Sequence, residues 1–246
     1  MGYTCVNYNG WKFVIDSCHS LWEVHNCDNK SNDVYIPHKF PTGEIIDIIS
    51  PYTFQDEEFG TITISDGVRV ICDLAFSAVT AEEIVWPSSC TVIGRRAFKR
   101  CKVSKISNID HVNQIGEGAF ECSKINSLVW PSACLTIPKN CFYQAEIPEV
   151  SNIDCVRTIE ECAFEEFKSD CLCWPKLCGI IPRKCFARSA LKEIRNLSSV
   201  NKVENLAFYK VQTLKSLDFS CSIHLDTEKN SFSKDLLVLL PYYQDT

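Results

Sequence analysis

The stretch VWPSSCTVIGRRAFKRC, residues 85–101, contains the pattern that decides the fold. Its phenylalanine is one of eight that follow one another at intervals of 22 residues, without insertion or deletion. These are Phe54, Phe76, Phe98, Phe120, Phe142, Phe164, Phe186 and Phe208. Five residues before each of them stands an aliphatic residue, which is Ile in seven repeats and Val203 in the eighth. A fixed period of roughly 20 to 50 residues is typical of a solenoid, in which each unit buries its apolar face against its neighbours.

Apolar residues also recur after each phenylalanine, and we number these positions from it. Apolar residues stand at positions +5, +8, +10 or +11, and +14, as in Ile125, Leu128, Trp130 and Cys134 after Phe120. The spacing of two between +8 and +10 is the period of a β-strand with one buried face. We therefore predict a strand in every repeat, followed by a short helical turn or irregular segment that returns the chain.

Several segments resemble the BspA-like leucine-rich repeats, whose unit reads approximately L-x-x-I-x-I-P-x-S-V-x-x-I-G-x-x-A-F. The resemblance is carried by VWPSSCTVIGRRAFKRC, by SLVWPSACLTIPKNCF (127–142) and by NQIGEGAFEC (113–122), and it covers nearly the whole chain. It implies a curved, right-handed α/β solenoid with a parallel strand ladder on the concave face and short helical or irregular returns on the convex face. It also implies a binding or surface role without catalytic residues.

The pattern predicts one elongated domain in three parts. Residues 1–43 form an N-terminal β-hairpin cap and the lead-in to the first repeat, residues 44–219 form eight leucine-rich repeats, and residues 220–246 form a degenerate last repeat with a C-terminal cap. The apolar positions slip by one after Phe208, and two more residues enter before Phe232. Caps are expected at both ends because an open solenoid end exposes core and unpaired strand edges.

A second period, of 44 residues, appears at position +10. Tryptophan alternates there with asparagine, as Trp86, Asn108, Trp130, Asn152, Trp174 and Asn196. One interpretation is volume matching in the core, with each Asn bonding turn backbone or an indole N–H. The other is a row of tryptophans presented to a ligand. The apolar residue two positions before each Trp places it on the buried face and favours the first interpretation.

Composition excludes some classes of partner and location. The net charge is −6 and Lys and Arg are scattered, which disfavours nucleic acid as a partner. The sequence has no run of about 18 apolar residues, so we expect no membrane-spanning helix. The start, MGYTCVNYNGWKF, lacks the regions of a signal peptide, so we expect a cytoplasmic protein. The alternative is a cell-surface or secreted protein from which a signal peptide was removed.

Many of the 16 cysteines occupy repeat positions where other repeats have small hydrophobic residues. At position +14, Cys90, Cys134 and Cys178 alternate with Val112, Val156 and Val200. We therefore predict free, buried thiols in a reducing compartment. Two pairings stay open, because the residues are nearly in register on adjacent rungs: Cys101 with Cys122, and Cys155 with either Cys134 or Cys178.

Catalytic or metal-binding sets are not expected. The five histidines do not recur with the repeat and show no Ser-His-Asp or Cys-His arrangement, so we predict a non-enzymatic protein without a cofactor. The densest group of metal-ligand residue types is Cys18, His19, His25 and Cys27. It lacks the C-x-x-C spacing of structural zinc sites and lies in the predicted hairpin, so we predict no metal there.

With +8 and +10 buried, positions +7 and +9 are predicted to line the concave face. These are Thr61, Thr63, Glu83, Val85, Lys105, Ser107, Ser127, Val129, Glu149, Ser151, Cys171, Cys173, Glu193 and Arg195. The surface is mixed and slightly acidic, which suits a broad interface with a protein partner better than a small-molecule pocket. The alternatives are self-assembly through the solenoid ends or convex side, and a face of merely solvated residues. Cys171 and Cys173 are both predicted to point outward from the concave face of one strand. They are either a reactive or ligand-contacting pair or tolerated surface thiols.

Overall fold

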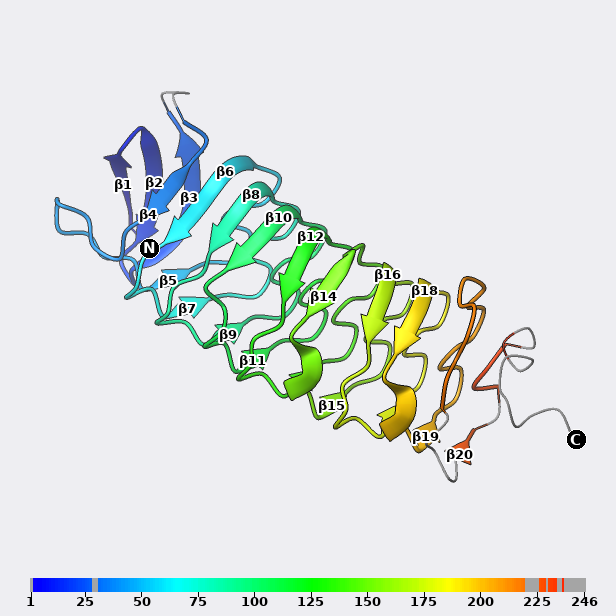
Figure 1. Ribbon diagram of the computed structural model, residues 1–246. Coiled ribbons are helices and arrows are strands. Elements are labelled where there is room, and N and C mark those ends of the chain that lie inside the picture. Colours follow the sequence, from blue (N-terminus) through cyan, green and yellow to red (C-terminus); the bar gives the residue numbers. More distant parts are fainter. Residues whose placement is uncertain (1, 28–30, 220–225, 229, 234–235, 237–246) are drawn as a thin grey trace, which may run out of the picture.

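Each repeat forms one turn of a β-solenoid, and the turns follow one another in a single row (Figure 1). The computed structural model describes residues 2–27, 31–219, 226–228, 230–233 and 236. Every turn contributes a two-residue strand to a minor ladder, and the turns up to β18 (Ala190–Arg195) also contribute a longer strand to a second ladder, here called the strand ladder. The predicted parallel-strand solenoid with a 22-residue turn is therefore confirmed.

The strand ladder is a parallel sheet whose rungs keep the sequence period. Strands β4 to β14 form one six-stranded sheet, and β16 pairs with β18 beyond the parallel bridge between Glu146 and Lys168. Val103 lies opposite both Ala81 and Ile125, its equivalents 22 residues away. The strands are β4 (Val34–Ile36), β6 (Glu58–Ile64), β8 (Thr80–Val85), β10 (Lys102–Ser107), β12 (Lys124–Val129), β14 (Glu149–Ser151), β16 (Lys168–Cys173) and β18 (Ala190–Arg195).

The minor ladder carries the aliphatic residue that precedes each phenylalanine by five. Ile93, for example, lies opposite Ile115, and the Gly116 amide donates to the Ile93 carbonyl at 2.8 Å. Its strands are β5 (Ile48–Ile49), β7 (Val70–Ile71), β9 (Val92–Ile93), β11 (Gln114–Ile115), β13 (Thr136–Ile137), β15 (Thr158–Ile159), β17 (Ile180–Ile181), β19 (Lys202–Val203) and β20 (Asp226–Thr227). Burial of one aliphatic residue per rung between two ladders gives the molecule a continuous core.

The eight phenylalanines form one stack through that core. All are fully buried, and successive ring centroids lie 4.7–5.6 Å apart with ring planes 5–24° from parallel. The backbone follows the same period, since the Phe98 amide donates to the Ala119 carbonyl at 2.8 Å and the Phe120 amide to the Cys141 carbonyl at 2.9 Å. Ring stacking and backbone hydrogen bonding thus fix the same register.

Turns, and not helices, return the chain around each phenylalanine. The residues two before and two after it have positive φ in every repeat, for example Arg96 at 52° and Arg100 at 59°. Within residues 2–27 and 31–219, the only helical segments are the 3₁₀ helices η1 (Ile153–Cys155) and η2 (Leu197–Ser199). The label α/β and the predicted helical returns therefore describe the fold only loosely. Right-handedness and a concave strand ladder stay predictions.

The tryptophan and asparagine alternation is a packing device. Trp86, Trp130 and Trp174 are fully buried, so the interpretation as an exposed ligand-binding row is wrong. The indole of Trp86 lies between Phe76 and Phe98, with ring centroids 6.0 and 5.8 Å away, and donates to the Cys90 carbonyl at 2.8 Å.

Two of the three asparagines bond backbone, which is one of the two roles expected for them. Asn108 has φ 59°, and its amide donates to the Trp86 carbonyl at 2.6 Å. Asn152 does the same to Trp130 at 2.8 Å. Asparagine tolerates this left-handed backbone better than most residues. It therefore closes the turn and also donates to a backbone carbonyl of the neighbouring rung.

The N-terminal cap is an antiparallel sheet of β1 (Tyr3–Tyr8), β2 (Trp11–Asp16) and β3 (Ser20–Asn26), and β3 continues in parallel into β5 of the minor ladder. Trp11 stacks on Phe59 of β6 with centroids 5.5 Å apart. Phe13 packs against Phe40 at 5.1 Å. The cap covers the first rung with aromatic side chains and so ends the core.

The slipped repeat still joins the stack. Phe232 lies 5.2 Å from Phe208 with planes 6° apart, and the two residues form a parallel bridge. The 24-residue interval between them is therefore accommodated outside the stack. The rest of the predicted C-terminal cap, including residues 220–225 and 237–246, lies outside the described residues.

Removing one ring from the middle of the stack should open a cavity between two neighbouring rings. We expect Phe120→Ala or Phe142→Ala to lower the free energy of unfolding by about 3–5 kcal/mol. Phe232→Ala should cost less, because this ring is 9% exposed and stacks face to face on only one phenylalanine of the described chain. Equilibrium unfolding in urea checks both, and an unchanged midpoint for Phe120→Ala would contradict the register.

Candidate functional site

The predicted binding positions +7 and +9 lie together on the strand ladder. Each of the fourteen residues is exposed or half-buried, and none is buried. The register places them in rows, with Glu83 opposite both Thr61 and Lys105, and Cys171 opposite Glu193. The ladder therefore presents two parallel lines of side chains to solvent. Their role in binding stays a prediction.

Positions +4 and +6 also face solvent, which the sequence interpretation missed. On β8, Ala81 and Ile84 are buried, whereas Glu82 between them is exposed and Glu83 half-buried. Two consecutive residues thus point outward between the buried positions +5 and +8. The spacing of three between those apolar positions was the available signal, because strict alternation would have required a spacing of two.

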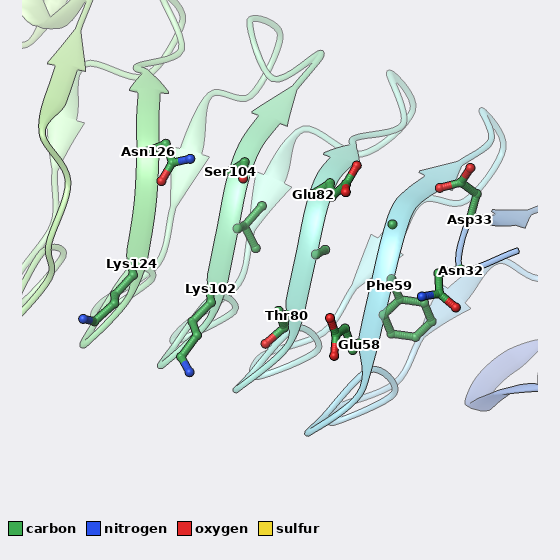
Figure 2. A pocket seen from close by; sticks show the side chains of 13 residues that line it. Asn32, Asp33, Glu58, Phe59, Thr80, Glu82, Lys102, Ser104, Lys124 and Asn126 are labelled. Atoms are coloured by element: carbon green, nitrogen blue, oxygen red, sulfur yellow. The ribbon is translucent and has the colours of Figure 1, made fainter.

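The outward residues at +4 and +6 border a hollow on strands β6 to β12 (Figure 2). Its volume is about 550 Å³. Phe59, Ala81 and Val103, all at position +5, lie at its floor and are only 3–4% exposed. The hollow lies where small residues, Gly60 and Ala81, replace the larger side chains of later rungs.

The N-terminal cap closes one end of this hollow. Asp33 accepts a hydrogen bond from the Thr61 amide at 2.6 Å, and its own carbonyl accepts one from the Trp11 indole at 3.0 Å. A Cβ at Gly60 would lie 2.3 Å from the Asp33 carboxylate oxygen, so a side chain there would displace the loop. Glycine at this one rung lets Asn32 and Asp33 form an end wall.

Ion pairs neutralise part of the ladder face. The Lys105 ammonium lies 3.3 Å from the Glu83 carboxylate, and Arg195 pairs with Glu193 through two hydrogen bonds of 2.9 and 2.7 Å. A hydrogen bond from Ser107 and the nearby Lys105 lower the pKa of Glu83, despite some desolvation. Both glutamates are therefore ionised at neutral pH, whereas Glu149 makes no ion pair with any described residue.

The metal-like group in the cap is spread out by the strand that contains it. Cys18 and His19 precede β3, and His25 and Cys27 lie at its far end. A seven-residue strand is about 23 Å long, so the two halves cannot share an ion. Across the described residues, no group of three or more His, Cys, Asp or Glu side chains has the arrangement of a metal site. Likewise, no helix there has the length and hydrophobicity needed to cross a membrane.

Comparison with protein families identifies the repeat. The model for the BspA type leucine rich repeat region matches residues 47–169 and 127–237, with six copies, and so covers most of the chain. This chain belongs to the BspA-type leucine-rich repeat family. A comparison with curated proteins finds no match.

Comparison with solved structures finds proteins similar to this BspA-type chain. A leucine-rich cell surface protein from Faecalibacterium prausnitzii A2-165 superposes with a TM-score of 0.53 at 15% identity, covering 83% of this chain and 67% of that one. The pneumococcal vaccine antigen PcpA gives 0.46 at 16% identity, covering 93% and 78%. At such identities, the Faecalibacterium structure supports the fold alone.

The cysteines of the BspA-type repeats are unbridged in the structure. This holds for all 15 that lie among the described residues. Cys155 illustrates the local reason, since its Sγ lies 3.8 Å from the Pro131 carbonyl oxygen and 3.9 Å from that of Cys134. His111 makes the equivalent contacts in its own repeat, to the carbonyls of Pro87 and Cys90. The position therefore serves to bond the turn of the preceding rung.

Cys171 and Cys173 occupy the outer face of β16, as predicted. Cys173 is exposed and Cys171 half-buried, and their register partners on β18 are Arg195 and Glu193. Burial raises the pKa of Cys171, while Arg195 acts in the opposite direction. A thiol with a raised pKa is a weaker nucleophile at neutral pH, so this environment does not favour a reactive pair.

The buried thiols at position +14 should make stability depend on alkaline pH. Burial raises the pKa of Cys178 to about 11, and the pKa values of Cys90 and Cys134 shift in the same direction. In the unfolded chain these thiols ionise near pH 9, so between about pH 9 and 11 the folded chain holds more protons. The free energy of unfolding should therefore fall as pH rises through this window.

The matched variant carries the three substitutions Cys90→Val, Cys134→Val and Cys178→Val. Valine already occupies position +14 in alternate repeats, so the fold should be preserved. We expect a shallower loss of stability in urea unfolding between pH 8 and 10.5. Equal slopes for the two proteins would show that these thiols do not carry the effect.

Proposed function

We propose that this chain is a non-enzymatic protein-interaction module whose partner binds the strand ladder. The observation that supports the proposal most is the pair of in-register rows at +7 and +9, which present polar and charged side chains on a rigid sheet. A sheet face of this kind, which we take to be the concave face, suits contact with a broad protein surface. The parallel lattice beneath holds the side chains at fixed separations, so the surface is organised before a partner arrives.

Membership in a leucine-rich repeat family agrees with a binding role and not with catalysis. The ladder face offers carboxylates and ammonium groups side by side, of which Glu83 with Lys105 is one pair. Such a mixed surface repels polyanions less than an acidic surface does. It also attracts them far less than a basic stripe would. A protein partner is therefore favoured over nucleic acid.

The two predicted locations have different support. The Faecalibacterium neighbour is titled a cell surface protein, which supports the cell-surface alternative over the cytoplasm. The unbridged cysteines agree with a reducing compartment. Of the two, we propose the cell surface because of the similarity to the Faecalibacterium protein, and buried thiols such as Cys141 and Cys185 are compatible with it, since burial raises their pKa values and shields them.

Charge reversal on the ladder tests the proposed surface. The variant Glu83→Lys, Glu149→Lys, Glu193→Lys should weaken binding of a partner isolated from the native source and identified by mass spectrometry at least tenfold. Direct titration of the purified pair measures this change. The reason is that three carboxylates, spread over rungs β8 to β18, change sign on the proposed contact surface.

The matched control reverses three exposed carboxylates away from +7 and +9, namely Asp56, Asp110 and Asp154. It should bind normally. Equal weakening by both variants, or by neither, would contradict a partner site on the ladder, and unchanged thermal unfolding of both variants shows that they fold.

A specific observation also supports self-assembly through the N-terminal end. Strand β1, with sequence YTCVNY, is the edge of the five-stranded sheet and has no charged residue. Tyr3 and Trp22 beside it are exposed and pack edge to face at 6.5 Å. An uncharged edge strand is a template for antiparallel pairing with a second copy.

Placing a charge on that edge separates this second candidate from the first. Thr4 is exposed on β1, and Thr4→Lys should shift a dimer to monomer in sedimentation velocity if two β1 strands pair. Lys12, already present on β2, shows that the cap tolerates lysine. A protein that is monomeric without the substitution, at concentrations up to about 100 µM, would exclude the candidate.

A further inference from the structure

The hollow on β6 to β12 separates charge along the solenoid axis. Glu58 and Glu82 lie toward its N-terminal end, and Lys102 and Lys124 toward its C-terminal end (Figure 2). Among the described residues, Glu58, Glu82 and Lys102 make no ion pair, while Lys124 lies 3.1 Å from Glu146 on the far side of the hollow. One side of the hollow is thus acidic and the other basic.

The ladder register keeps Glu58 away from the lysines, whereas Glu82 lies one rung from Lys102 without forming an ion pair with it. Glu58 lies opposite Thr80, and Thr80 lies opposite Lys102, so two rungs separate the carboxylate from the ammonium. Two rungs correspond to about 10 Å, which is too far for an ion pair. Lys102 lies directly opposite Lys124, and like charges in that relation repel. A ligand with an anionic group at the lysines would relieve this repulsion.

We infer that the hollow binds an extended peptide segment of the protein partner, laid across β6 to β12, with a cationic side chain at Glu58 and Glu82 and a carboxylate at Lys102 and Lys124. The inference rests on the proposed function and names the kind of segment that the ladder recognises. The volume of about 550 Å³ lies within the range of ligand sites, roughly 300–1,000 Å³.

The distance between the two charged ends sets the spacing in the peptide. A polyproline II segment rises about 3.1 Å per residue and returns to the same face every three residues. Three residues therefore span about 9.3 Å, close to the two rungs of about 4.8 Å each that separate Glu58 from Lys102. The segment carries Arg or Lys and Asp or Glu three positions apart, in either order along its chain.

The floor and end wall agree with an extended occupant. Phe59, Ala81 and Val103 form the floor and are only 3–4% exposed, so the peptide residues between the charges lie over the strands and do not enter the core. Asp33, held by the Thr61 amide, stands at the acidic end and adds a third carboxylate there. A polyphosphate would meet these carboxylates, so the charge order favours a peptide with both signs.

The test is selection from a phage-displayed library of random 12-residue peptides on the whole chain. We expect the enriched sequences to carry opposite charges three residues apart. Synthetic versions, titrated by fluorescence anisotropy, should bind at least tenfold more weakly when the same residues are reordered to place the charges side by side. No enrichment, or equal binding of the reordered peptides, overturns the inference.

Three variants locate the binding. Lys102→Glu and Glu82→Lys reverse one end each, and Ser104→Phe fills the hollow without changing its charge. All three residues are exposed, so the fold should be retained. Each variant should weaken the selected peptides at least tenfold. Undiminished binding by Lys102→Glu or by Ser104→Phe would place the peptides elsewhere and overturn the inference.

The matched control is Lys168→Glu, which changes the same repeat position on β16, outside the hollow. It should bind the selected peptides as the unmodified protein does, and equal weakening by this control would overturn the inference. The outcome is independent of the triple reversal at Glu83, Glu149 and Glu193. If the triple variant loses the native partner but the library yields no enriched peptide, the proposed function stands and the peptide site is rejected.

Discussion

The stack of phenylalanine rings is the constraint on which the other features depend. Its centroid spacing of 4.7–5.6 Å brackets the spacing of about 4.8 Å between hydrogen-bonded strands, so rings and backbone can share one period. An extra residue in one turn would displace either the ring or the ladder. The constant interval of 22 residues follows from that double requirement. The 24-residue step to Phe232 shows that the turn can lengthen only where the ring still reaches the stack.

The sequence predicted the buried positions well, because eight copies reveal which positions never vary in character. It predicted the returns less well, and the reason is physical. The left-handed residues beside each ring include Leu74, Ala78 and Arg100, which have no preference for positive φ. Their conformation is imposed by the ladder, as the Arg100 amide bonds the Glu121 carbonyl at 2.8 Å. A local preference could not have signalled a turn that only neighbouring rungs stabilise.

Polar contacts between rungs were the other part that sequence could not specify. His111, Cys155 and Ser199 share one repeat position, and each side chain lies against backbone carbonyls of the preceding tryptophan repeat. Three different residue types contact the same backbone carbonyls in successive tryptophan repeats. The sequence therefore shows no repeated residue that would reveal this contact. Cys155 consequently looked like a disulfide candidate with Cys134, whereas its thiol faces the Cys134 carbonyl.

In a repeating solenoid, the same position on each rung has nearly the same surroundings. A distinctive site therefore forms only where one rung differs from its neighbours. In this chain that difference lies beside the N-terminal cap. Trp11 stacks on Phe59 and holds the Asp33 carbonyl, Asp33 occupies the space above Gly60, and Ala81 leaves the next rung shallow. The cap that ends the hydrophobic core thus also shapes the hollow. Substitutions that loosen the cap should alter the hollow before they alter the distant rungs, because each rung contacts only its neighbours.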